Sequence, residues 1–330
     1  MQNSDGDDMV FQLDDSSGTR NDFLRFDNSA GSANFSVPLG MGSNQINNVA
    51  DPTEAQDAAT KSYVDSQVSS SSCPSGYVRV PGSDKYGTSD FCVMKWEAKN
   101  DGSGNPVSQA SGNPWVNIEQ YTARQECRSL GDNYHLISER EWMTIAENVM
   151  RQPSNWADSN IGSKASNGGG MYIGNVAPPS SHSHLGYDGP NPDSGTSRPE
   201  SASLNLSNGN EIYDLSGNVW EWTDYYIISD GAGGNEMPQP GDSSWHEYTN
   251  ITDYRGMRHA RPLNPSWNAS QGIGRMHPDG DNAYPSGTTH AVLRGGHWGR
   301  GADAGVLSVA LHTAPSRTYS GFGFRCSKTL

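Results

Sequence analysis

The chain has 330 residues, enough for one large domain and a smaller segment, and only 33% of them are hydrophobic. Its 38 glycines and 19 prolines favour a loop-rich globular fold over a helical bundle. The formal charge of −15 disfavours nucleic acids and anionic lipids as partners. The N-terminus has no basic region followed by an apolar stretch, and no apolar run approaches about 18–20 residues. We therefore expect neither a signal peptide nor membrane insertion.

The first 36 residues are polar and acidic, and two short pieces, "MVFQL" and "DFLRF", predict weak strands joined by a turn. Farther along, Thr53 and Gln56 have the spacing of a capping box, which predicts a helix from about Glu54 to Val68. One apolar stripe on so polar a helix cannot be buried within its own chain, so we expect this helix to need partner helices.

This segment resembles a repeat found in phage tail-fibre and tail-collar proteins. The matching residues are Met41, Ile46, Asn47, Asp57–Lys61 and Tyr63–Asp65. The resemblance implies that residues 1–72 form an attachment segment, which assembles as a homotrimer and joins other virion tail proteins. Serines 69–72 predict a flexible linker, so the second domain is expected at 73–330. An ordinary solvated linker helix is the alternative.

The four cysteines are Cys73, Cys92, Cys127 and Cys326, and none lies in a Cys-x-x-Cys pair. This spacing argues against a zinc ribbon or a thioredoxin-like site. Disulfides between residues 73 and 92 and between 127 and 326 are the favoured pairing, although four cysteines allow three connectivities. Such bridges would suit a particle that ends up outside a cell. Four buried thiols are the alternative.

The second domain opens with two apolar pieces, "YVRV" and "FCVMKWEA", which predict a hairpin. A helix is predicted from about Glu119 to Leu130, ended by Gly131. A second helix is predicted over "SEREWMTIAENVM", where Ser138 and Glu141 form a capping box. Later short strands include "ASLNL", "EIYDLSG" and "VWEWTDYYI", of which the last should bury its two tryptophans and turn Glu221 away.

Four motifs, "ISEREWMTIA", "DLSGNVWEW", "LRGGHW" and "GFRC", occur in the order seen in the formylglycine-generating-enzyme-type C-type lectin fold. The chain resembles that family over most of residues 74–330. The resemblance implies an α+β C-type lectin fold with two helices, short antiparallel strands and long loops. It also places the first helix beside the last strand, which supports the Cys127–Cys326 pair.

Some members of the family bind Ca²⁺ through the segment that matches Asp214, Gly217, Val219 and Glu221, and oxygen ligands suit that ion. Pairing of Glu221 with an arginine is the alternative. His182 and His184 form a weaker candidate metal pair, since solvated loop histidines are far more common. No cofactor is certain, and Ca²⁺ is the one candidate.

The catalytic members of the family use redox-active cysteines shortly after the Arg-Gly-Gly motif. Residues 297–324 of this chain contain no cysteine. The sulfur that would ligate copper is therefore absent, so we expect no catalytic residues and no enzyme activity.

The segment of about 294–326 resembles the variable region of proteins diversified by diversity-generating retroelements. Small or apolar scaffold residues alternate there with positions expected to vary: His297, Gly299, Arg300, Asp303, Ser308, Ala310, His312, Thr313, Arg317, Thr318, Tyr319, Ser320, Gly321 and Phe322. Randomising the first two bases of AAC codons never gives Lys, Gln, Glu, Met or Trp, and none of these occurs from Gly299 to Phe322. An ordinary polar loop over a stable strand is the alternative.

These observations predict a viral receptor-binding protein at a tail-fibre tip, made in the host cytoplasm and located in the virion. Its variable face would bind a host cell-surface protein or glycan, with Tyr319 as the expected anchor. The alternatives are an oxidising enzyme of the formylglycine-generating type, a structural virion decoration protein and an ordinary adhesin.

Overall fold

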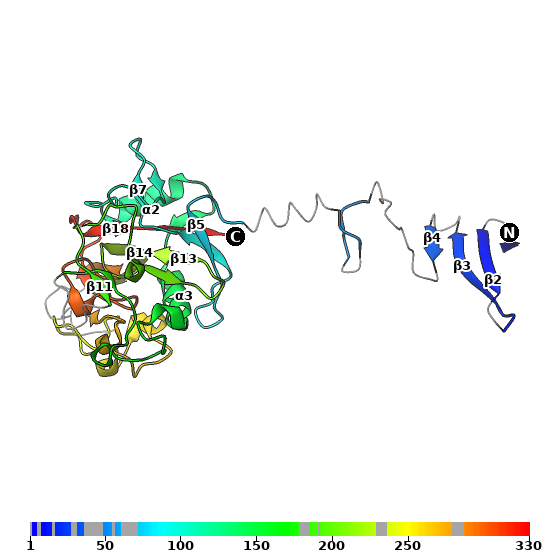
Figure 1. Cartoon of the computed structure of the whole chain (residues 1–330). Helices are drawn as coiled ribbons and strands as arrows, with labels where there is room; N and C mark the ends of the chain where they lie inside the picture. The colour runs from blue at the N-terminus through cyan, green and yellow to red at the C-terminus, as the bar shows by residue number, and fades with distance from the viewer. Residues whose placement is uncertain are drawn as a thin grey trace. The chain divides into compact units, whose positions relative to one another are not determined.

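The computed structural model describes residues 2–4, 8–14, 17–27, 32–35, 49–54, 57–60, 72–177, 185–190, 192–228, 236–278 and 287–330. The chain forms two compact units, Met1–Ser69 and Ser70–Leu330 (Figure 1). Several residues named above lie outside the described ones: Met41, Ile46, Asn47, Gln56, Tyr63–Asp65, His182 and His184.

The first unit contains one four-stranded antiparallel sheet in the order β1-β2-β3-β4. Its strands are β1 (Gln2–Ser4), β2 (Asp8–Asp14), β3 (Arg20–Asp27) and β4 (Ser32–Phe35). The two strands predicted from the sequence are β2 and β3.

The helix predicted from Glu54 to Val68 does not begin where the capping pattern placed it. Glu54 and residues 57–60 are not helical, and residues 61–71 lie outside the described part. The carboxylate of Asp57 instead accepts hydrogen bonds from the backbone N–H groups of Thr53 and Glu54, at 2.9 and 3.0 Å. Such local side-chain bonds compete with the helix, and a short polar helix without a packing partner is marginal.

The second unit is built on a five-stranded sheet and a four-stranded sheet. The five-stranded sheet has the order β15 (Met276–His277), β17 (Val309–Thr313), β16 (Thr289–Arg294), β14 (Trp220–Ile228), β18 (Phe322–Phe324). The four-stranded sheet has the order β5 (Tyr77–Val80), β6 (Phe91–Met94), β19 (Cys326–Thr329), β9 (Tyr134–Leu136). Both ends of the domain therefore meet in one sheet, because β19 pairs with β6.

Three short ladders complete the strands: β7 (Lys99–Asn100) with β8 (Pro106–Val107), β10 (Gly174–Asn175) with β11 (Gly186–Tyr187), and β12 (Ser203–Asn205) with β13 (Glu211–Tyr213). The expectation of antiparallel strands was wrong in part, because β14–β18, β15–β17 and β10–β11 pair in parallel. Long connections between these strands let the chain re-enter a sheet in the same direction.

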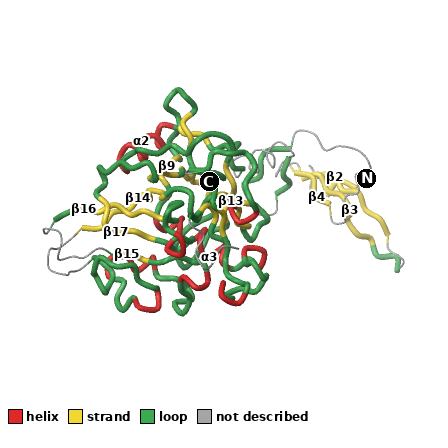
Figure 2. Tube along the Cα trace, turned by 60° about the vertical axis from the view of Figure 1, so that its left-hand side comes forward, coloured by secondary structure: helices red, strands yellow, loops and turns green. Residues whose placement is uncertain are grey.

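Among the described residues of the second unit, the α-helices are α2 (Gln120–Ser129) and α3 (Glu139–Met150), close to their predicted bounds. Ser138 and Glu141 form the predicted capping box at the start of α3. Both helices contact β14 and lie on opposite sides of it (Figures 1 and 2). Short 3₁₀ turns lie at Pro153–Asn155, Ala165–Asn167, Glu200–Ala202, Tyr248–Asn250, Arg255–Ala260, Ala269–Gln271 and Gly301–Asp303.

The five-stranded sheet separates two hydrophobic clusters. The α3 cluster includes Trp142, Val292, Val309 and Leu311. The α2 cluster includes Trp220, Trp222, Ala310 and Phe322. Both faces of the sheet are thus covered, which is why Glu221, expected to turn away from the core, is fully buried on the far side of its strand.

Candidate functional site

The backbone of the segment 294–326 is held by hydrogen bonds from parts of the chain outside it. Ile273 and Arg275 accept, through their carbonyls, the N–H groups of Leu307 and Val309 at 2.9 and 3.0 Å. The carbonyl of Asn218 accepts the N–H of Trp298 at 3.1 Å. Because these bonds join backbone to backbone, they do not depend on the side chains of the segment.

A second set of backbone bonds fixes the loop before β18. The N–H groups of Asn117 and Gln120 donate to the carbonyls of Tyr319 and Pro315, at 3.1 and 3.0 Å. Gln120 is itself buried, and its side-chain amide donates to two carbonyls of β14 at 2.7 and 2.8 Å. The start of α2 therefore joins this loop to β14.

Side chains along β17 alternate between the two faces of the sheet. Val309 and the expected scaffold residue Leu311 belong to the α3 cluster. The expected variable residue Ala310 lies in the α2 cluster, and His312, two positions along, is half-buried. From Val309 to Leu311 the period of two thus sends alternate side chains to opposite faces, and a register shift between Ala310 and the expected variable residue Thr313 interrupts the alternation.

The expected variable positions do not form one exposed face. The exposed ones are Gly299, Arg317, Thr318, Tyr319 and Ser320, and the half-buried ones are Arg300, Asp303 and His312. The buried ones are His297, Ser308, Ala310, Thr313, Gly321 and Phe322, which corrects the expectation of an exposed set. The reason is tertiary: β17 and β18 lie within a sheet whose α2-side face is also packed.

A row of aromatic rings runs across this end of the unit, and we call it the aromatic row. Its consecutive ring-centre distances lie between 4.5 and 6.4 Å. Its members, in order, are Trp222, Phe322, Tyr319, His297, Trp220, Trp245, His277 and His312. The row joins the exposed Tyr319 to buried tryptophans of β14 and then to half-buried rings at the sheet edge.

Sequence reasoning missed Trp245 and His277, which lie outside every motif. His277 reaches the row because β15 pairs with β17, opposite Ala310. Trp245 reaches it because His246 and Met276 exchange backbone hydrogen bonds at 2.7 and 3.0 Å. No local sequence pattern predicts either ring contact.

Charged or titratable side chains at this end of the unit include Arg275, Arg300 and His297. Arg275 binds both Glu247 and Asp303, at 2.6 and 3.0 Å. The guanidinium of Arg300 lies 5.5 Å from the ring centre of Trp245. Burial, aided by Arg300, lowers the pKa of His297 to about 4, and its Nδ1 accepts the N–H of Gly299 at 3.0 Å. His297 is therefore neutral near pH 7.

Two buried ion pairs anchor the ends of the segment. Arg294 bonds Glu139 of α3 through Nε and Nη2, the former at 2.9 Å. Arg325 forms a bidentate pair with Glu221, at 2.5 Å on each side. All four side chains are at most 2% exposed. The arginines of the Arg-Gly-Gly and Gly-Phe-Arg motifs thus each have a fixed carboxylate partner.

The proposed Ca²⁺ ligands do not fit a calcium site. Glu221 is occupied by Arg325, and Asp214 lies 3.1 Å from Arg198. The N–H of Val219 donates to the carboxylate of Glu97, and the N–H of Gly217 donates to the carbonyl of Gly295. Guanidinium groups thus already bind the carboxylates that Ca²⁺ would need.

A buried polar cluster lies where the sequence suggested a Ca²⁺ site. Glu97 is fully buried and accepts the amide of Asn218 at 2.6 Å. Burial, together with Asp214 and Glu221, raises its pKa well above the usual range. Burial likewise raises the pKa of Asp214 to about 6, against the opposing charge of Arg198. Across the described residues, no group of three or more His, Cys, Asp or Glu side chains is arranged to hold a metal ion.

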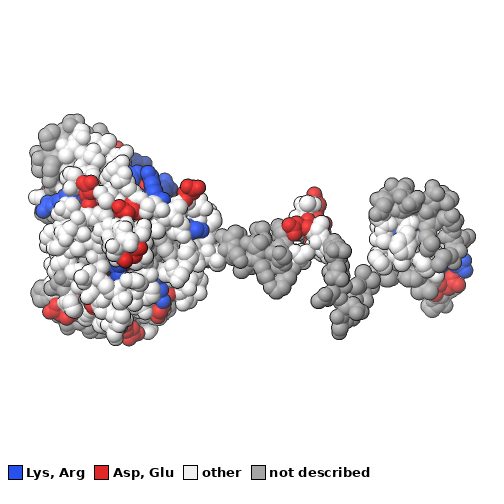
Figure 3. All heavy atoms as spheres, turned by 90° about the horizontal axis from the view of Figure 1, so that it is seen from above, with Lys and Arg blue, Asp and Glu red and all other residues white. Residues whose placement is uncertain are grey.

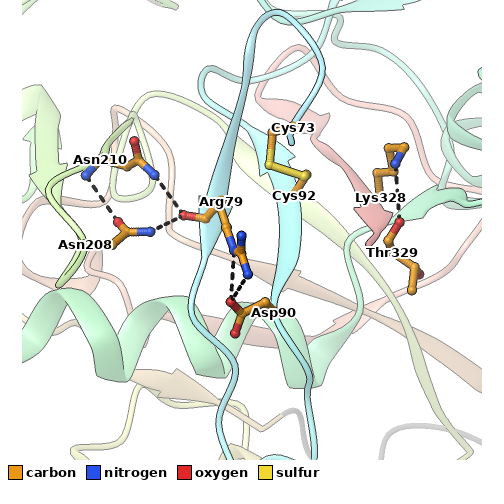
Figure 4. Close-up of a disulfide and its surroundings, with 8 residues drawn as sticks. All are labelled: Cys73, Arg79, Asp90, Cys92, Asn208, Asn210, Lys328 and Thr329. Atoms are coloured by element: carbon orange, nitrogen blue, oxygen red, sulfur yellow. Dashed lines mark hydrogen bonds and ion pairs between the residues drawn. A yellow bond between two sulfur atoms is a disulfide. The ribbon is translucent and has the colours of Figure 1, made fainter. Parts of the chain in front are cut away.

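All four cysteines form disulfides, Cys73–Cys92 and Cys127–Cys326, the pairing favoured from the sequence. The first ties the start of the second unit to β6, beside the Arg79–Asp90 ion pair (Figure 4). The second ties α2 to β19. No thiol is left for redox chemistry.

Within the part of the chain that the structure describes, no helix is long and apolar enough to span a membrane. In the view of Figure 3, basic and acidic side chains are scattered among uncharged ones over the second unit.

Comparisons with known proteins place these features in a family. Among curated proteins, none matches this chain in sequence. Three similar solved structures are Major Tropism Determinant P3c Variant (14% identity, TM-score 0.37), Treponema denticola variable protein 1 (16%, 0.36) and PvdO from Pseudomonas aeruginosa (15%, 0.38). The matches cover 78%, 76% and 78% of this chain, in the same order. They cover 53% of the first of those chains, 91% of the second and 92% of the third. This chain therefore spans about half the length of Major Tropism Determinant P3c Variant. The model for the sulfatase-modifying factor enzyme 1-like domain (FGE-sulfatase) matches residues 11–330. Since that match covers nearly the whole chain, the protein belongs to the FGE-sulfatase domain family, with its α+β C-type lectin fold.

Proposed function

We propose that this protein is a ligand-binding protein that recognises diverse host-surface ligands through the variable segment, at the tip of a viral tail fibre. The observation that carries the proposal is the way the segment is held. Its backbone is bonded by residues 117, 120, 218, 273 and 275, all outside it. Side chains at its exposed positions can therefore change while the backbone keeps its course.

Substitutions at the exposed positions also remove few buried contacts. Arg317, Thr318, Tyr319 and Ser320 project from a loop whose two ends are bonded to the start of α2. Tyrosine, serine and arginine are residue types that adaptable binding surfaces use. In Figure 1 the segments around residues 300 and 320 lie on the side of the second unit away from its C-terminus.

An oxidising activity of the formylglycine-generating type is disfavoured by the chemistry available. Both disulfides occupy structural positions, and Cys326 bonds α2. The carboxylates Glu139 and Glu221 are committed to arginines. We therefore assign the chain no catalytic residue and no cofactor.

For the first unit we propose attachment to other virion tail proteins as a homotrimer, which places the protein in the virion after synthesis in the host cytoplasm. The proposal rests on the tail-fibre-like residues Asp57–Lys61 and on the small size of the sheet β1–β4. A single four-stranded layer buries little apolar surface alone, so assembly with other copies would stabilise it. Three copies would also strengthen weak single-site binding.

The test compares two display libraries made from the full chain. The first randomises the exposed positions Gly299, Arg317, Thr318, Tyr319 and Ser320. The control randomises the exposed turn residues Asp101, Gly102, Ser103 and Asn105. We expect most members of the first library to melt within a few degrees of the parent and to yield binders to immobilised streptavidin. An equal or smaller yield than the control library would refute the proposal.

Sequencing of the gene's surroundings tests diversification separately. We expect a near-identical second copy of codons 294–326 close to a reverse-transcriptase gene, with differences confined to adenine positions. A locus without such a copy would refute diversification and favour an ordinary adhesin.

A further inference from the structure

We propose that a cavity at the C-terminal end of α3 binds a sulfated or phosphorylated sugar. None of the residues that line this cavity belongs to the segment 294–326. The site is therefore separate from the variable segment, and the inference goes beyond the proposed function without depending on it.

The cavity has a volume of about 350 Å³, which falls within the range of about 300–1,000 Å³ typical of small-molecule sites. Its walls come from the loop after β5, the end of α3 with the two residues that follow it, the loop between β12 and β13, and Leu263. Parts of the chain that lie far apart in sequence thus enclose one polar space.

Positive charge exceeds negative charge in this cavity. Lys85 and Arg151 line it together with a single carboxylate, that of Glu147. Partial burial lowers the pKa of Lys85 against the opposing effect of Glu147, and the charges of Arg151 and Arg261 lower it further. Both arginines therefore lie within electrostatic range of the lysine, in a chain whose formal charge is −15. A bound anion would offset the repulsion between these cations.

The carboxylate of Glu147 is already engaged by groups of the protein. Its Oε1 accepts the backbone N–H of Leu263 at 2.5 Å and the hydroxyl of Tyr86 at 3.3 Å. Lys85 Nζ lies 3.9 Å from the same oxygen, and it donates to the Tyr86 hydroxyl and the Arg261 carbonyl at 2.7 and 2.9 Å. These two bonds use two of the three N–H groups of Lys85, so one N–H group remains for a ligand.

The polar groups left open in the cavity are mostly donors. Among the described residues, the exposed guanidinium of Arg151 and the hydroxyl of Ser83 have no hydrogen-bond partner. The hydroxyl of Ser207 accepts the side-chain amide of Asn148 at 2.9 Å, which leaves its own proton to donate. Gln152 donates its amide N–H to the carbonyl of Asn148 at 3.1 Å, so its Oε1 remains an acceptor.

A tetrahedral oxyanion on a sugar ring matches this set of groups. Arginine binds sulfate and phosphate groups through two parallel N–H···O bonds, and Lys85 can add a third. A bare ion would leave most of the cavity to water, whereas the hydroxyls of a sugar can bond both Ser207 and Gln152. No aromatic side chain lines the cavity among the described residues, which disfavours a nucleotide, whose base would need a ring to stack on.

The probes are the primary sulfate ester and the primary phosphate ester of glucose, compared with glucose and with inorganic sulfate. Each is titrated calorimetrically into the full chain. We expect one or both esters to bind at least about tenfold more tightly than glucose or sulfate, since hydrogen bonds to charged groups contribute that much. The tighter ester identifies the source of the oxyanion, and its affinity should fall as salt rises.

Variants locate the site. Arg151→Gln and Lys85→Gln should each weaken the tighter ester by about tenfold or more. Arg128 is the matched control, because it is exposed at the end of α2 and lines a different cavity, of about 470 Å³. Arg128→Gln should leave the affinity unchanged. If Lys85→Gln fails to fold by circular dichroism, Lys85→Arg keeps the charge and should retain more affinity than Arg151→Gln.

Equal affinity for glucose and both esters would overturn the inference, as would inorganic sulfate binding as tightly as the esters. A loss in Arg128→Gln equal to that in Arg151→Gln would overturn it as well. If the variable-segment library yields streptavidin binders while neither ester binds, the proposed function stands and the sugar site is refuted. If an ester binds through Arg151 while the library yields no binders, the sugar site stands and the proposed function is refuted.

Discussion

Replacing Glu221 with Gln would test whether the buried ion pair at the end of the variable segment holds the domain together. Glu221 lies on β14, between β16 and β18, and bonds Arg325 at 2.5 Å through both carboxylate oxygens. The same guanidinium donates to the carbonyls of Met94 and Tyr213, each at 3.1 Å. Arg325 therefore joins the five-stranded sheet to β6 and to the strand β13.

The magnitude follows from burial. Both side chains are fully buried, so Glu221→Gln leaves the guanidinium in the core without the carboxylate that it bonds directly. Breaking such a pair from one side costs about 3–5 kcal/mol of unfolding free energy. For a domain of this size, about 1 kcal/mol shifts the melting temperature by roughly 2–4 °C. We expect the melting temperature to fall by about 10 °C.

The assay is urea unfolding of the full chain with its disulfides intact, followed by near-ultraviolet circular dichroism from the buried tryptophans. The double variant Glu221→Gln/Arg325→Met removes the orphaned charge and should be more stable than the single variant. A cost below about 1 kcal/mol for Glu221→Gln would refute the reasoning, as would a double variant less stable than the single one.

Three further predictions separate stability from recognition. Tyr319→Ala should change the free energy of unfolding by less than about 1 kcal/mol because the ring is 41% exposed, whereas Trp220→Ala should cost about 3–5 kcal/mol; equal costs in chemical denaturation would contradict this. His297 has a folded pKa of about 4, below its unfolded value, so its stabilising contribution is complete above about pH 6.5 and is lost as pH falls toward 4. Wild type should therefore lose up to about 3 kcal/mol relative to His297→Phe across that window, and parallel pH profiles would disprove it. Replacing Cys127 and Cys326 with serine should cost about 5 kcal/mol, because the bridge closes a loop spanning 199 residues; a melting temperature unchanged by the double substitution would exclude that role.

Much of the second unit was predictable because its signals are local. The capping box at Ser138 and Glu141 and the glycine after Leu130 define helix ends from neighbouring residues alone. Turn residues and short apolar runs likewise predicted the β5–β6 hairpin and the long strand β14. The family motifs then supplied the order of these elements, and the family match agrees with them.

The sequence by itself determined the bounds of α2 and α3 and the identity of the family, and it predicted which positions of the segment carry variable side chains. Only the tertiary structure decided which of those side chains reach solvent, because burial of Ala310 and Phe322 depends on a second packed face that no local pattern reports. It also decided that Asp214 and Glu221 bind arginines and not a metal, since their partners lie 16 and 104 residues away along the chain. Trp245 and His277 enter the candidate site for the same reason: pairing between distant strands, not sequence spacing, brings their rings beside β17.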